Sequence, residues 1–213
     1  MKVVCLLALA AAPAQEIDLK PWKLTLPVGA PREIQDPSDF SSEHFMKIEG
    51  GIRFRAPVDG ATTPNSSYPR CELRERDAAW STTEGVHTLT IRQAVTRTPA
   101  RKPHVVAGQI HDAEDDVVMI RLEGRKLFVE GDGKNLGVLD PDYRLGTFFT
   151  VRIRAEGGRI RVDYDGVLKV DLGRRAKGCY FKAGVYTQSN LEKGELPGDY
   201  GEVVIRELSV AHE

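Results

Sequence analysis

The chain carries the stretch YFKAGVYTQ at residues 180–188, in which polar or aromatic side chains alternate with small or apolar ones. A β-strand shows every second side chain to the same face. One face of this strand would therefore hold Tyr180, Lys182, Tyr186 and Gln188. The alternation predicts a strand that packs against a core on one side and presents polar groups on the other.

Two shorter stretches show the same alternation, RCELR at 70–74 and QIH at 109–111. Their polar faces hold Arg70, Glu72 and Arg74 in the first stretch and Gln109 and His111 in the second. If the three strands line one sheet, their polar faces form a groove of cations, hydrogen-bond donors, a histidine and tyrosines. We expect such a groove to bind an anionic sugar polymer.

Turn signals recur every eight to twelve residues along the chain, which is typical of a β-sandwich or barrel. We predict an all-β fold of two stacked antiparallel sheets, with strands at residues 23–27, 52–56, 70–76, 86–98, 105–111, 117–123, 126–130, 148–156, 159–164, 167–171, 180–188 and 202–211. Only residues 36–45 look helical, because Asp36 could cap a helix and Pro37 fits its first position.

The length of 213 residues and the absence of repeats or a dividing linker predict one domain, at residues 15–213. Residues 1–14 have the pattern of a secretory signal peptide: Lys2, an apolar run, then Ala-Pro-Ala. A buried first strand is the alternative. The run is too short to span a bilayer, so we expect a secreted protein, extracellular or periplasmic, without a membrane partner.

Removal of residues 1–14 leaves 29 basic and 31 acidic residues, a formal charge of −2. A polyanion would therefore be bound by a local cationic groove, and the balance argues against a nucleic-acid partner. Cys71 and Cys179 also remain, and a secreted protein with two cysteines is a candidate for one disulfide. Two buried free thiols are the alternative.

The three stretches, in this order, resemble the signature blocks of polysaccharide lyase family seven, the alginate lyases. The resemblance extends to WKLTLP at 22–27, GATTPNSSYP at 60–69 and VVIRELSV at 203–210, and so covers nearly the whole mature chain. It implies a jelly roll of the concanavalin-A-like kind, with one concave sheet as the groove, and a monomer. It also associates isoleucine at position 110 with guluronate-containing blocks and implies endo-acting cleavage of alginate.

Uronate polymers can be cut by β-elimination: a base removes the C5 proton, and the bond to the C4 oxygen breaks. Arg70 suits the uronate carboxylate because a guanidinium meets it in a bidentate fashion, and Gln109 can donate its amide to the same group. His111 either adds to this neutralisation or acts as the base. Tyr186 is the natural proton donor to the leaving oxygen. The resemblance implies the same four catalytic residues.

Flanking substrate contacts are expected from Glu72, Arg74, Lys182, Gln188 and Tyr180, although Glu72 could instead hold Arg70 or Arg74 by a salt bridge. No zinc spacing or phosphate loop is present, so we expect no metal and no cofactor. The acidic residues at 112–116 could suggest calcium, but a solvated turn is the simpler interpretation.

Three alternatives stay open. A non-catalytic, lectin-like carbohydrate-binding sandwich would need neither a base nor a phenolic acid. A glycoside hydrolase would need two neighbouring carboxylates, and Glu72 has no acidic partner on its face. A lyase for another polyuronate, such as a glucuronan, would use the same chemistry.

Overall fold

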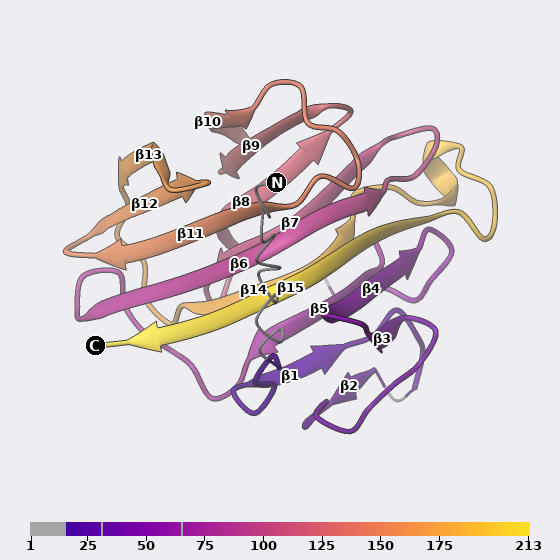
Figure 1. Cartoon of the computed structure of the whole chain (residues 1–213), viewed down its shortest axis with the longest axis horizontal. Helices are drawn as coiled ribbons and strands as arrows, with labels where there is room; N and C mark the ends of the chain where they lie inside the picture. Colours follow the sequence, from indigo (N-terminus) through magenta and orange to yellow (C-terminus); the bar gives the residue numbers. More distant parts are fainter. Residues whose placement is uncertain (1–15, 31, 65) are drawn as a thin grey trace, which may run out of the picture.

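A computed structural model describes residues 16–30, 32–64 and 66–213 (Figure 1). The expected signal peptide at residues 1–14 lies outside these residues. In the described part of the chain, no helix has the length and apolarity needed to cross a membrane.

The described residues form two stacked antiparallel sheets (Figure 1). One sheet has the spatial order β10 (Lys134–Asp140), β9 (Lys126–Gly131), β8 (Asp116–Glu123), β7 (His104–His111), β14 (Tyr180–Thr187), β5 (Arg70–Glu75), β1 (Trp22–Thr25) and β2 (Glu33–Ile34). The other has the order β13 (Val167–Gly173), β12 (Arg159–Tyr164), β11 (Phe149–Glu156), β6 (Val86–Arg97), β15 (Tyr200–His212), β4 (Gly51–Pro57) and β3 (Phe45–Ile48). The predicted all-β sandwich is confirmed.

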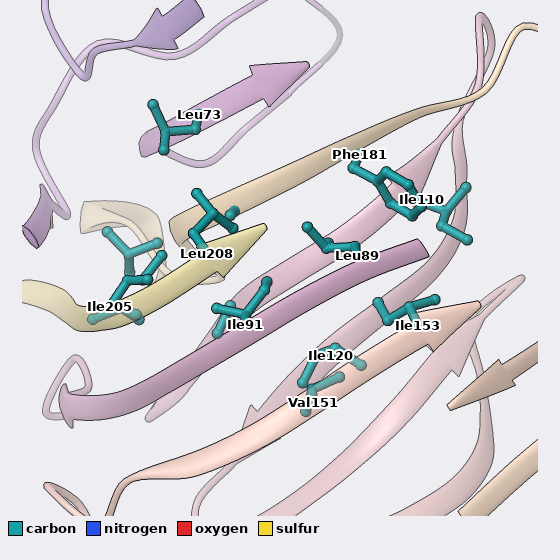
Figure 2. Packing of buried hydrophobic residues seen from close by; sticks show 14 of the residues in the cluster. Leu73, Leu89, Ile91, Ile110, Ile120, Val151, Ile153, Phe181, Ile205 and Leu208 are labelled. Atoms are coloured by element: carbon teal, nitrogen blue, oxygen red, sulfur yellow. The ribbon is translucent and has the colours of Figure 1, made fainter. Parts of the chain in front are cut away.

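The core lies between the two sheets (Figure 2). Ile110 and Phe181 belong to it from the eight-stranded sheet, and Leu89, Ile153 and Ile205 from the seven-stranded sheet, all fully buried. Since side chains alternate along a strand, burial of these residues turns their neighbours to the outer face of the eight-stranded sheet. We call that outer surface the polar face.

The predicted helix at residues 36–45 is wrong. The Asp36 carboxylate accepts a hydrogen bond from the Ser38 backbone at 3.0 Å, and Phe40 N donates to Pro37 O at 3.1 Å, which closes a turn. An aspartate that bonds its neighbouring backbone favours turns as readily as helix caps. Phe45 then begins β3, which, like β2 and β10, the sequence pattern did not predict.

The predicted disulfide is also wrong, because Cys71 and Cys179 are both free and buried. Their strands are neighbours, but the antiparallel register places Cys71 opposite Val185. Cys179 precedes β14, six positions before Val185, which is about 20 Å along a strand. Disulfide formation requires Cα atoms within about 7 Å. Burial raises the pKa of both thiols, that of Cys179 to about 11.

Candidate active site

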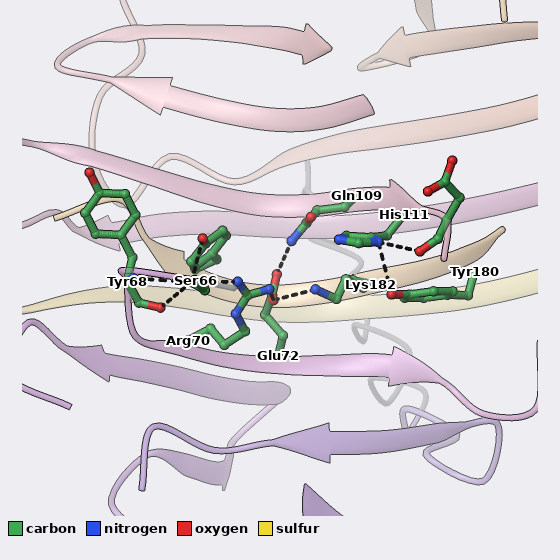
Figure 3. Close-up of polar contacts among 10 residues, drawn as sticks. Ser66, Tyr68, Arg70, Glu72, Gln109, His111, Tyr180 and Lys182 are labelled. Atoms are coloured by element: carbon green, nitrogen blue, oxygen red, sulfur yellow. Dashed lines mark hydrogen bonds and ion pairs between the residues drawn. The ribbon is translucent and has the colours of Figure 1, made fainter. Parts of the chain in front are cut away.

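Strand β14 lies between β5 and β7, and its register brings the three polar stretches together. Tyr186 lies opposite Arg70, and Tyr180 lies opposite His111. Lys182 lies between Arg74 of β5 and Gln109 of β7. The side chains form one line along the polar face, which we call the polar row: Tyr68, Ser66, Arg70, Glu72, Gln109, Lys182, His111 and Tyr180 (Figure 3). Tyr186 also belongs to this row, because it contacts both Ser66 and Arg70.

Glu72 is the centre of the polar row. One carboxylate oxygen lies 3.3 Å from Arg70 Nη1 and 3.3 Å from Lys182 Nζ. The other oxygen accepts a hydrogen bond from the Gln109 amide. Exposed fractions are 0% for Glu72, 1% for Gln109, 5% for Lys182 and 8% for Arg70, so these contacts are shielded from water. The expected salt-bridge role of Glu72 is therefore observed, with Arg70 and Lys182 rather than with Arg74.

The charges in this cluster depend on one another. Burial acts to raise the pKa of Glu72, but the cations of Lys182 and Arg70 and the Gln109 hydrogen bond outweigh it, so the pKa lies below its ordinary value. Burial lowers the pKa of Lys182, and Glu72 opposes that shift. The carboxylate thus remains ionised and holds two cations and an amide donor side by side.

Tyr186 packs against Arg70, whose guanidinium carbon lies 3.7 Å from the centre of the phenol ring. The Ser66 hydroxyl lies 2.9 Å from Tyr186 Oη and accepts a hydrogen bond from Arg70 Nη2 at 3.1 Å. Both the ring and the hydroxyl of Tyr186 are therefore held in place. A phenol fixed beside a guanidinium is positioned to give up a proton next to a bound anion.

His111 is held at the other end of the row. Its Nδ1 donates to the Asp112 carbonyl at 2.7 Å, since a carbonyl can only accept. In the neutral ring this bond leaves Nε2 as the acceptor. Burial, followed by the cation of Lys182, lowers the pKa of His111, so the neutral form dominates at neutral pH. Tyr180 stacks on the imidazole, with its hydroxyl 3.0 Å from Nδ1.

The other predicted contact residues are placed differently. Arg74 lies over the ring of Tyr180, 4.1 Å from its centre, and so joins the row at its Tyr180 end. Gln188 is not brought to the Glu72 cluster. It accepts a hydrogen bond from Arg121 at 3.3 Å, within a separate ion-pair group that includes Glu130.

Two contributors were missed by sequence reasoning. The Ser66 hydroxyl comes from the Gly- and Pro-rich loop that leads into Arg70, and the loop composition marks a flexible segment without indicating which hydroxyl reaches Tyr186. The Asp112 carbonyl is a backbone group, which no side-chain pattern can reveal. The signal for both was only their closeness in sequence to a polar stretch.

The acidic residues at 112–116 form a turn. The Asp112 side chain accepts hydrogen bonds from the backbone of Glu114 and Asp115, at 2.8 and 2.9 Å. Within residues 16–30, 32–64 and 66–213, no three metal-ligating side chains gather into a site. The polar row itself offers cations, an amide, an imidazole and a phenol.

Together these groups can bind a carboxylate and move protons near it. Arg70 and Gln109 offer a guanidinium and an amide donor. The Tyr186 phenol lies at the Arg70 end of the row, in register with Arg70. The His111 imidazole lies at the other end, beyond Gln109 (Figure 3). An arrangement of this kind suits proton abstraction beside a carboxylate, with a second group to protonate a leaving oxygen.

Comparison with known proteins agrees with this geometry. A family model described as "Alginate lyase" matches residues 17–212. An alginate lyase from Klebsiella pneumoniae is 26% identical over 289 aligned positions, which cover 96% of this chain and 92% of that protein.

Solved structures give a closer match. Alginate lyase AlgAT5 from polysaccharide lyase family 7 is 51% identical, with a TM-score of 0.91 over 96% of this chain and 100% of that chain. An alginate lyase from Corynebacterium sp. is 41% identical, with a TM-score of 0.88 over 94% and 98%. At 28% and 27% identity, and with TM-scores of 0.79 and 0.77, variants of the family 7 alginate lyase A1-II' have been crystallised with a product (GGG) and a substrate (GGMG). The alignments cover 96% of this chain in both cases, and 100% and 97% of those chains.

Proposed function

The chain belongs to the alginate lyases of polysaccharide lyase family 7, and on that premise we propose that it is secreted and cuts alginate within the polymer, preferring guluronate-containing blocks. As an alginate lyase it breaks the glycosidic bond by β-elimination. The observation that carries the proposed site is the buried cluster of Arg70, Gln109 and Lys182 around Glu72, with His111 and Tyr186 on either side.

The first task of the site is to make the C5 proton acidic. The substrate carboxylate already carries a negative charge, so charge that builds up at C5 must be stabilised from outside. A uronate carboxylate beside Arg70 and Gln109 meets two donors that are fixed before it arrives. Fixed donors in a shielded site stabilise developing charge without having to reorganise.

The second task is proton transfer. A base takes the C5 proton, the electron pair of that C–H bond forms the C4–C5 double bond, and the C4–O bond breaks as its oxygen receives a proton. Tyr186 supplies that proton. Neutral His111 offers Nε2 as a base, because Nδ1 is committed to the Asp112 carbonyl. Mannuronate and guluronate differ at C5, so we assign His111 to one epimer and Tyr186, acting also as base, to the other.

Two observations bear on the cleavage mode and the block preference. Binding groups on both sides of Arg70, toward Arg74 in one direction and Tyr68 in the other, favour internal cleavage. We propose that the protein acts as a monomer, as the family resemblance implies. Ile110, at the position that the family resemblance associates with guluronate, is fully buried in the core. Any effect of Ile110 on block preference must therefore act through the packing of Gln109 and His111.

Ultraviolet absorbance during incubation with polyguluronate, polymannuronate and mixed alginate tests the function. Elimination leaves a conjugated double bond, so we expect absorbance to rise fastest with polyguluronate and intermediate-length products to appear first. New reducing ends without absorbance would mean a hydrolase. If neither signal appeared, a binding module or a lyase for another uronate, such as glucuronan, would be indicated.

Tyr186→Phe tests the proton donor. We expect turnover to fall by about 10²–10⁴-fold, the usual contribution of a positioned acid or base. Polymer binding should persist, because the ring that packs on Arg70 is retained. Tyr200→Phe is the matched control, since Tyr200 lies in β15 of the other sheet. An active Tyr186→Phe enzyme would remove Tyr186 from the mechanism.

A further inference from the structure

A lysine that the polar stretches do not contain lies at the Tyr186 end of the polar row. Lys102 belongs to the loop between β6 and β7, and its Nζ donates to Tyr68 Oη at 3.3 Å. The same ammonium lies 4.9 Å from the centre of the Tyr68 ring. Tyr68 in turn lies beside Tyr186, with ring centres 6.5 Å apart. The Tyr68 ring therefore lies between Lys102 and Tyr186, the proposed proton donor.

Lys102 has a free charge. It makes no ion pair with any residue in the described ranges, whereas Arg70 and Lys182 share the Glu72 carboxylate. The side chain is partly buried, so part of its hydration is already lost. A cation in that situation gains more from an incoming carboxylate than a fully hydrated lysine would.

A buried carboxylate, that of Glu195, holds the backbone of Lys102 in place by hydrogen bonds. Glu195, 5% exposed, accepts hydrogen bonds from Lys102 N at 2.7 Å and from Arg101 N at 3.0 Å. It also accepts one from the Ser189 hydroxyl at 2.7 Å. The two loops that flank this end of the row are thus tied together, and the lysine backbone is ordered before substrate arrives, which lowers the entropic cost of binding.

We propose that Lys102 and Tyr68 form a carboxylate-binding subsite for a uronate unit on the Tyr186 side of the cleaved bond, with Glu195 as a positioning residue. The ammonium would pair with the uronate carboxylate, and the Tyr68 ring would support the sugar. This inference rests on the proposed function, because it assigns the subsite to the same polymer.

Lys102→Met tests the subsite, with Arg101→Met as the matched control. Both changes remove one positive charge from the same loop, but only Lys102 contacts Tyr68. We expect Lys102→Met to raise KM for polyguluronate about tenfold, which corresponds to about 1.4 kcal/mol, and to leave kcat within about twofold. Arg101→Met should change neither constant. Equal effects of the two variants, or an unchanged KM in Lys102→Met, would overturn the proposal.

A double-mutant cycle with Glu195→Gln tests the positioning role. If Glu195 acts through Lys102, the single variant Glu195→Gln raises KM, but the same change adds little to KM when Lys102→Met is already present. Fully multiplicative effects would remove Glu195 from the proposal. The lyase assay on the wild-type protein tests the function, and an absence of activity refutes it. Calorimetric titration of polyguluronate tests the subsite separately, in the Tyr186→Phe background so that the polymer is not cut: equal affinities with and without Lys102→Met refute the subsite.

Discussion

Glu72→Gln is the most informative change to the fold and the site together. Glutamine keeps the size of the side chain and removes the charge that faces Arg70 and Lys182 at 3.3 Å each. Both cations are at least nine-tenths buried, so water cannot readily replace the carboxylate. The variant would leave two like charges close together in a shielded site.

The expected cost is large. Removing one partner from a buried ion pair destabilises a protein by about 3–5 kcal/mol. In a domain of about 200 residues each kcal/mol shifts Tm by about 2–4 °C, so we expect Tm to fall by roughly 10 °C at pH 7. The pKa of Glu72 in the folded protein lies below its ordinary value of 4.5. Its stabilisation is therefore fully present above pH 4.5 and is lost as the pH falls through the folded-state pKa.

Thermal unfolding of wild type and Glu72→Gln between pH 7 and pH 3 measures both effects. The difference in Tm should be greatest at neutral pH and should narrow below pH 4.5. Glu207→Gln is the control, because Glu207 is a largely exposed carboxylate, 3.9 Å from Arg92, whose loss should change the free energy of unfolding by no more than about 0.5 kcal/mol. A Glu72→Gln variant as stable as wild type at pH 7, or a pH-independent difference, would refute the ion-pair account.

Three further outcomes are expected. The pKa of His111 is lowered from 6.5 by burial and by Lys182, so on acidification kcat/KM should begin to fall only below pH 6.5. A fall in kcat/KM with a midpoint at or above pH 6.5 would contradict a neutral His111. Gly184→Ala should destabilise the protein by more than about 2 kcal/mol. Gly184 has φ 134°, and an added methyl group would lie 2.5 Å from the Cys71 carbonyl oxygen. Unchanged stability would show that β5 and β14 can shift apart. In protein lacking residues 1–14, a thiol reagent should react with two cysteines in denaturant and with none in the native state. If the denatured protein had no free thiol, Cys71 and Cys179 would be joined in a disulfide after all.

The faces of the strands could be predicted because alternation is a local property. Arg70, Gln109 and Lys182 point the same way for reasons that each short stretch contains in itself. The partners of each residue could not be predicted, since they depend on the register between strands. The sequence predicts a salt bridge from Glu72 to Arg70 or Arg74, and the Arg70 pair is observed. The second partner is Lys182 rather than Arg74, because the pairing of β5 with β14 brings Lys182 to Glu72.

Register also explains the disulfide error. Cys71 and Cys179 each lie next to a polar stretch, and neighbouring strands made a bridge plausible from sequence alone. In an antiparallel pair, residues near the starts of two strands lie at opposite ends of the sheet. The contacts of Ser66 and Lys102 were beyond prediction for a different reason, because loop residues have no periodicity that could place them.

The polar row raises the question of how a protein can hold buried cations before any substrate arrives. Arg70 and Lys182 are 8% and 5% exposed, and two uncompensated charges at that depth would be costly. Glu72 offsets them in the empty site, and it does so with a carboxylate, the same chemical group that a uronate presents. In the mechanism we propose, the substrate carboxylate therefore enters a site whose donors are already arranged around a carboxylate. The ion pairs with Lys182 and Arg70 also keep Glu72 ionised. Glu72 is therefore unsuited to act as the protonated acid that a glycoside hydrolase would need.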